Sequence, residues 1–104
     1  MQMYNPAHPG AILREAMGED ITITHLARHL RMTRANLSMI LNGRMSVSPL
    51  VATKLAEAFP WTDAELWLRL QNQYDLAKVL RKKRQKILPV RPHKPVEHKL
   101  KNAA

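Results

Sequence analysis

The sequence predicts an all-α protein with five helices followed by a disordered basic tail. Helix-capping residues recur at the start of apolar stretches that have helical spacing, and no stretch of useful length alternates apolar and polar residues as a strand does. The last 18 residues combine lysines with regularly spaced prolines, a composition that cannot bury enough surface to fold. We therefore expect an N-terminal arm at residues 1–7, a helical domain at 8–86 and a tail at 87–104.

The first two helices are predicted from their boundary residues. Pro9 suits the first position of a helix, and Gly18 provides a stop after one apolar face. Thr24 can cap a short second helix. The residues expected to face inward are Ile12, Leu13, Ala16 and Met17 in the first helix and Leu26, Ala27 and Leu30 in the second.

The third and fourth helices carry clearer signals. Thr33 caps the third helix, and Asn42-Gly43 supplies a left-handed exit. Ser48-Pro49 begins the fourth helix and Pro60 stops it. The inward residues are expected to be Leu37, Ile40 and Leu41, followed by Leu50, Leu55, Ala56 and Phe59.

The fifth helix is expected to be the longest, from a capping box at Thr62 and Glu65 to about Lys86. About 22 residues make a helix roughly 33 Å long, which exceeds the diameter of so small a domain. Part of the apolar stripe of this helix should therefore overhang the core. The stripe includes Ala77 and Leu80 as well as Leu66, Trp67, Leu70 and Tyr74. Internal packing alone is one explanation of such a stripe, but a homodimer is favoured, with an interface at Leu66, Trp67, Leu70, Tyr74 and Leu76.

The formal charge of +9 is unevenly distributed. Residues 1–80 carry eight basic and seven acidic side chains, whereas residues 81–104 carry nine and one. The overall charge therefore mainly describes the tail. A run such as RKKRQK at 81–86 is most often a solvated charge cluster. Its functional interpretation is contact with phosphate or with an acidic partner. Residues 21–56 are more informative, because they contain no carboxylate and five bases: Arg28, Arg31, Arg34, Arg44 and Lys54. One surface of the folded part should attract polyanions.

The second and third helices are joined by only two or three residues, which forces the steep crossing of a helix-turn-helix. The third helix then presents short, uncharged side chains outward, so its backbone can approach bases in a DNA groove. Arg34, near its N-terminus, is the best candidate for a guanine edge or a phosphate. An ordinary polar surface helix is the alternative. The predicted DNA-binding residues are Arg28, Thr33, Arg34, Ala35, Asn36, Ser38, Met39, Asn42 and Arg44.

The remaining polar residues indicate neither an enzyme nor a cofactor. His25 and His29 have a spacing that can hold zinc, but no third ligand is near. The chain has no cysteine and three glycines, and no paired carboxylates or nucleophilic triad can be identified. We expect no catalytic residue, metal or cofactor. The absence of a long apolar run or a signal-like N-terminus predicts no membrane partner and a cytoplasmic, nucleoid-associated location.

The stretch LARHLRMTRANLSMILNGR at 26–44 resembles the helix-turn-helix of Xre/lambda-repressor-like regulators. HPGAILRE at 8–15, SVSPLVATKLAEAF at 46–59 and ELWLRLQNQYDL at 65–76 extend this to a resemblance to HigA (VapI-like) antitoxins over about residues 8–80. HPG combined with LWLRLQNQYDL is its most specific part. Arg31 stands where the family usually has glycine, and Ile23 replaces a residue that is often polar.

The resemblance implies a lambda-repressor-like fold and a homodimer that binds double-stranded operator DNA, represses its own operon and neutralises a HigB ribonuclease toxin of RelE-like fold. Because such a toxin is basic, we expect it to meet the acidic residues Glu15, Glu19 and Asp20. Two alternatives remain: a solitary helix-turn-helix repressor without a toxin, and a helical module that binds RNA or protein through its tail.

Overall fold

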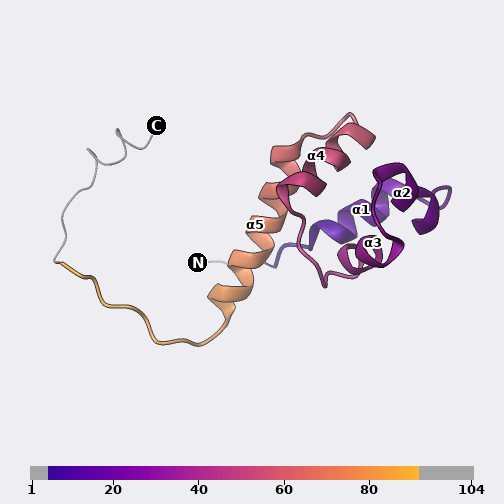
Figure 1. Cartoon of the computed structure of the whole chain (residues 1–104). Helices are drawn as coiled ribbons and strands as arrows, with labels where there is room; N and C mark the ends of the chain where they lie inside the picture. Colours follow the sequence, from indigo (N-terminus) through magenta and orange to yellow (C-terminus); the bar gives the residue numbers. More distant parts are fainter. Residues whose placement is uncertain (1–4, 92–104) are drawn as a thin grey trace, which may run out of the picture.

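The computed structural model describes residues 5–91 and consists of five helices (Figure 1). They are α1 (Pro9–Met17), α2 (Ile23–Leu30), α3 (Arg34–Leu41), α4 (Pro49–Ala58) and α5 (Ala64–Arg81). The predicted all-α fold with five helices is confirmed. Residues 1–4 of the predicted arm and 92–104 of the predicted tail lie outside the described residues, while 87–91 are exposed and contain neither helix nor strand. No helix within 5–91 is long and apolar enough to cross a membrane.

Several helix boundaries follow the signals in the sequence. Pro9 occupies the first turn of α1, and Gly18 follows the helix with a φ of 63°. Thr33 caps α3 and Ser48 caps α4, each through a side-chain oxygen that accepts a backbone N–H of the first turn. Gly43, with a φ of 74°, gives α3 its left-handed exit.

The predicted cap of α2 is wrong. The helix begins at Ile23, and Thr22 caps it by accepting the backbone N–H of His25 at 3.1 Å. Thr24 lies inside the first turn, where its hydroxyl accepts a hydrogen bond from the Nε atom of Arg34 instead.

The predicted start and end of α5 also require correction. Asp63 caps this helix, because the hydroxyl of Thr62 is engaged elsewhere: it donates to the carbonyl of Phe59 and accepts the indole N–H of Trp67. The helix ends at Arg81 and not at about Lys86. Its 18 residues correspond to about 27 Å, which still leaves room for an overhang.

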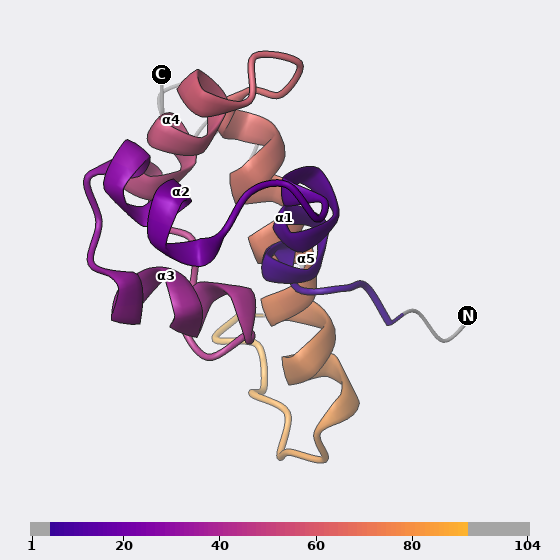
Figure 2. The same cartoon turned by 90° about the vertical axis from the view of Figure 1, so that its right-hand side faces the viewer.

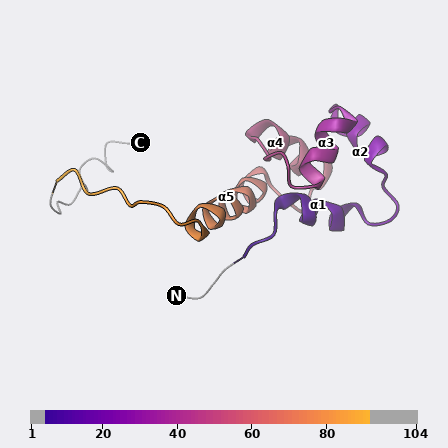
Figure 3. The same cartoon turned by 90° about the horizontal axis from the view of Figure 1, so that it is seen from below.

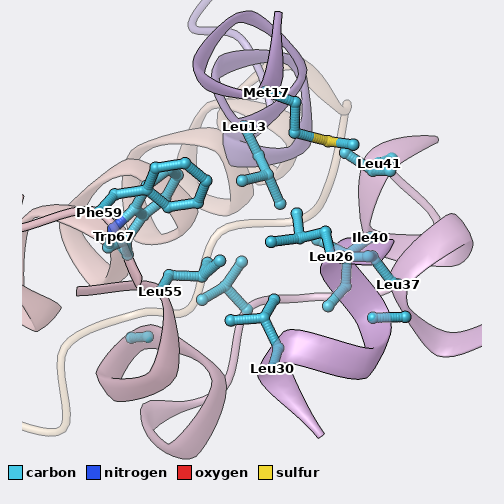
Figure 4. Close-up of a cluster of buried hydrophobic side chains, with 13 residues drawn as sticks. Leu13, Met17, Leu26, Leu30, Leu37, Ile40, Leu41, Leu55, Phe59 and Trp67 are labelled. Carbon is cyan, nitrogen blue, oxygen red and sulfur yellow. The ribbon is translucent and has the colours of Figure 1, made fainter. Parts of the chain in front are cut away.

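The hydrophobic core lies where the five helices meet (Figure 4). Trp67 is its largest fully buried side chain and has 1% of its surface exposed. In α4, Leu50 is exposed, contrary to expectation, because Ala52 and Leu55 define the buried side and Leu50 lies on the opposite side of the helix. The inward residues of the first three helices are confirmed as buried or partly buried: Ile12, Leu13, Ala16, Met17, Leu26, Ala27, Leu30, Leu37, Ile40 and Leu41.

The helix α5 extends beyond the cluster formed by α1 to α4 (Figures 1, 2 and 3). Its second half exposes three apolar side chains, Leu76, Val79 and Leu80, at 54%, 49% and 65% of their surfaces. At the other end, Trp61 in the turn between α4 and α5 is 71% exposed and lies edge-on to the ring of Phe59, with 5.2 Å between ring centroids. Both ends of α5 therefore have exposed apolar side chains next to them.

Candidate DNA-binding surface

The turn between α2 and α3 is held by an arginine in a conformation that favours glycine. Arg31 has φ 56° and ψ 49°, in the left-handed region, which costs an L-residue about 1 kcal/mol. The N–H of Met32 closes the turn by donating to the carbonyl of Ala27 at 2.9 Å. From α4, the Nζ atom of Lys54 donates to the carbonyl of Arg31 at 3.2 Å, so a cation satisfies the negative end of α2.

The helix α3 presents the outward face that the sequence predicts. Its apolar residues Leu37, Ile40 and Leu41 are buried, and the small or uncharged residues between them point away from the core. Ser38 is partly exposed. The other eight predicted DNA-binding residues are exposed: Arg28, Thr33, Arg34, Ala35, Asn36, Met39, Asn42 and Arg44.

Arg34 is oriented at the N-terminus of α3 by a contact from α2. Its Nε atom donates to the hydroxyl oxygen of Thr24 at 3.0 Å. This bond uses one of the five N–H donors of the guanidinium and leaves its terminal nitrogens available for a guanine edge or a phosphate. The sequence predicts Thr24 as a helix cap, and its contact with Arg34 is a finding of the structure.

The C-terminal end of α3 is held by a side chain of α1 that is not among the predicted DNA-binding residues. The Nη2 atom of Arg14, from α1, donates to Oδ1 of Asn42 at 2.9 Å. The amide nitrogen of Asn42 in turn donates to the hydroxyl of Ser38 at 3.4 Å. Asn42 is therefore oriented on both sides, and Arg14 adds a cation beside the predicted surface.

The residues predicted for a dimer interface differ in their exposure. Trp67 lies inside the core of the single chain, where its indole N–H is bonded to Thr62, so it cannot contact a second chain directly. Leu66, Leu70 and Tyr74 are partly buried. Leu76 is exposed, as are Val79 and Leu80, which follow it by three and four residues on the same side of α5.

The other predicted sites are distributed over α1 and α2. Glu15, Glu19 and Asp20 are all exposed, on the last turns of α1 and just after it. His25 and His29 lie with their rings nearly parallel, 6.4 Å apart between centroids. Within residues 5–91, no three His, Cys, Asp or Glu side chains are placed to hold a metal ion.

A helix-turn-helix family model matches residues 13–67. Virulence-associated protein A' of Dichelobacter nodosus is 46% identical over 79 residues, which cover 75% of this chain and 69% of that protein. A solved antidote protein of the HigA family from Coxiella burnetii aligns with a TM-score of 0.71 and 38% identity over 75% of this chain and 86% of that one. Pseudomonas aeruginosa antitoxin HigA, solved with the higBA promoter, aligns with a TM-score of 0.67 and 35% identity over 72% of this chain and 83% of that one.

Proposed function

We propose that this chain, which belongs to the helix-turn-helix family, is a HigA-like antitoxin that binds operator DNA through α3. The observation that carries the proposal is the outward face of α3, which has no carboxylate, short side chains and a single oriented arginine at its N-terminus. The structure of Pseudomonas aeruginosa HigA with its promoter supports the same class of ligand. Membership of this family also agrees with the expectation of a non-enzymatic protein.

The residues divide into base readers and backbone contacts. In this proposal Arg34 contacts a guanine edge or a phosphate at the N-terminal end of α3, and Ala35 or Met39 contacts the methyl group of a thymine. Arg28 and Arg44 contact phosphate oxygens, which fix the register without reading the sequence. Ser38 and Asn42, bonded to each other, line the far end of the same face.

A second chain would complete the reading surface. We infer a two-fold dimer in which the exposed stripe of Leu76, Val79 and Leu80 on α5 packs against its equivalent. Such a dimer reads two half-sites about one helical turn, roughly 34–36 Å, apart. Occupation of an operator in front of its own gene would make the protein an autorepressor.

Toxin neutralisation is the other part of the proposal. A RelE-like ribonuclease is basic, and Glu15, Glu19 and Asp20 offer it an exposed acidic patch. Complementary charge there mainly speeds association, while apolar contacts supply most of the affinity. Replacing the three carboxylates by their amides should therefore slow association with the toxin, most clearly at low salt. A solitary repressor is the alternative, and a RelE-like reading frame beside the gene would argue against it.

The DNA-binding proposal is tested by selecting preferred sequences from random DNA with the wild-type chain and with Arg34→Ala. Arg34→Ala should weaken binding to the selected operator by about 1–3 kcal/mol and relax the preference at one base pair. The matched control is Lys82→Gln with Lys83→Gln, outside α3, which should weaken all DNA sequences alike and flatten the salt dependence. If Arg34→Ala leaves both affinity and preference unchanged, α3 is not the reader.

A further inference from the structure

The backbone of α1 touches the backbone of α3 at Gly10. A β-carbon added at Gly10 would lie 2.0 Å from the carbonyl oxygen of Ile40 and 3.0 Å from the Cα atom of Leu41. No side chain fits there, because the obstructing atoms are main-chain atoms that cannot rotate away. Gly10 therefore lets α1 lie directly on the last turn of α3.

The imidazole of His8 fills the adjacent position, between the exit of α3 and the middle of α5. The side chain is 9% exposed, and its Nδ1 atom caps α1 by accepting the N–H of Gly10 at 2.9 Å. On one side, a β-carbon at Gly43 would lie 3.6 Å from the His8 ring. On the other side the ring meets Tyr74 edge-on, with 4.8 Å between centroids and 82° between planes. The ring thus separates the end of α3 from α5.

A third contact acts on the same end of α3. Arg14, one turn further along α1, holds Asn42 through the bond described above. The last turn of α3 and its exit are therefore fixed by three residues of one short helix and its cap, at Ile40, Asn42 and Gly43. By contrast, the N-terminal end of α3 is held from α2, through Arg34 and Thr24.

We propose that His8 and Gly10 are positioning residues for DNA reading: they set where the C-terminal end of α3 lies relative to α5. The inference rests on the proposed function, because it concerns the operator that a dimer would read. If α5 forms the dimer contact, the distance between the two copies of α3 depends on how each α3 is attached to its own α5. The His8 ring lies between the exit of α3 and α5, and Gln71 of α5 holds Val47 further along the same segment. The ring therefore contributes to which spacing of half-sites the dimer accepts.

The spacing of half-sites that a dimer accepts is a sensitive measure of where α3 lies. Adding one base pair between half-sites moves one of them by about 3.4 Å and turns it by about 35° around the DNA axis. A close-packed contact resists such movement, whereas a void left by a truncated side chain lets α3 shift. Loss of the His8 ring should therefore broaden the accepted spacing and leave the bases preferred within each half-site unchanged.

The experiment uses the full-length chain and the selected operator, resynthesised with its half-sites one base pair closer and one base pair further apart. His8→Asn retains a capping oxygen for the N–H of Gly10 and removes the ring. His8→Ala removes both. Leu30→Ala is the matched control, a core truncation in α2 away from the contact between α1 and α5.

Wild-type affinity should fall at least about tenfold at either altered spacing, since a shifted half-site loses its base contacts. For both His8 variants this fall should shrink to about threefold or less, with unchanged half-site preference. Leu30→Ala should weaken all spacings by one common factor. If His8→Asn and His8→Ala keep the narrow wild-type profile, His8 is only a helix cap and the proposal is wrong. A wild-type chain that selects no sequence would instead overturn the proposed function.

Discussion

The two halves of α5 differ in how far their apolar side chains are buried. In the first half, Trp67 is buried in the core and the side chain of Gln71 accepts the backbone N–H of Val47 at 2.9 Å. In the second half, Leu76, Val79 and Leu80 are about half exposed or more. Single exposed apolar residues are ordinary on monomeric proteins, whereas a contiguous apolar patch is typical of an interaction site.

The two halves of α5 therefore have different positions in the structure. Its first half belongs to the fold of the single chain, whereas its second half projects past the other helices (Figure 1). The segment before α1 lies alongside this second half, where Asn5 accepts a hydrogen bond from Arg81 and His8 meets Tyr74. Substitutions in the first half of α5 should therefore lower the stability of the fold, whereas substitutions in the second half should affect the proposed dimer.

The largest effect is expected from Trp67→Ala. Removing a fully buried indole should lower the free energy of unfolding by about 3–5 kcal/mol, because a large cavity remains and the bond to Thr62 is lost. Urea unfolding followed by circular dichroism measures this loss. Glu65→Gln, at an exposed position of the same half, serves as the control and should stay within about 0.5 kcal/mol of wild type. A loss below about 1 kcal/mol for Trp67→Ala would contradict the assignment of this half to the core.

Replacing Leu76, Val79 and Leu80 together by serine should affect association and leave the fold intact, the opposite of what is expected for Trp67→Ala. The secondary structure should persist, because these side chains are outside the core, but the dimer should dissociate. Sedimentation velocity at several concentrations measures the change, and operator affinity should fall because two half-sites are no longer bound by one particle. A wild-type chain that is monomeric at high micromolar concentration would refute the dimer built on α5.

The smallest effect expected is a pH dependence of stability that comes from His8, which packs against Tyr74 near the boundary between the two halves. Burial lowers the pKa of His8 below 6.5, and Lys78 lowers it further, while Asp75 acts in the opposite direction. The folded chain therefore binds fewer protons than the unfolded chain, so the contribution of His8 to stability is complete above pH 6.5 and is lost as the pH falls below it. Urea midpoints between about pH 8 and about pH 5.5 should show this decline in wild type and less of it in His8→Asn. Equal declines in the two proteins would contradict it.

The helices were predictable because their signals are local. Thr33, Ser48, Gly18 and Gly43 each act within one turn of their own helix. The errors at Thr24 and Thr62 have one physical cause. Several hydroxyl-bearing or acidic residues stand near each helix start, and the hydroxyls of Thr24 and Thr62 are each bonded to another group, Arg34 in one case and Phe59 and Trp67 in the other.

The support of the DNA-binding surface was not predictable from local patterns. Arg14 and Asn42 are 28 residues apart, and Gly10 meets α3 through main-chain atoms that leave no sequence signature beyond the glycine itself. The end of α5 was overestimated because the lysines and arginines after it are good helix formers. Their like charges at neighbouring helical positions repel one another, which favours an earlier end at Arg81.

The fluorescence of the two tryptophans reports on two different parts of the molecule. Trp67 is 1% exposed and lies among apolar side chains, so its fluorescence should change only when the core opens. Trp61 is 71% exposed and packs edge-on to Phe59, so unfolding should change its surroundings little. A molecule that covers the corner between α4 and α5 would shift the emission of Trp61 and leave Trp67 unchanged. Unlabelled protein can thus distinguish loss of structure from occupation of that corner in a single spectrum.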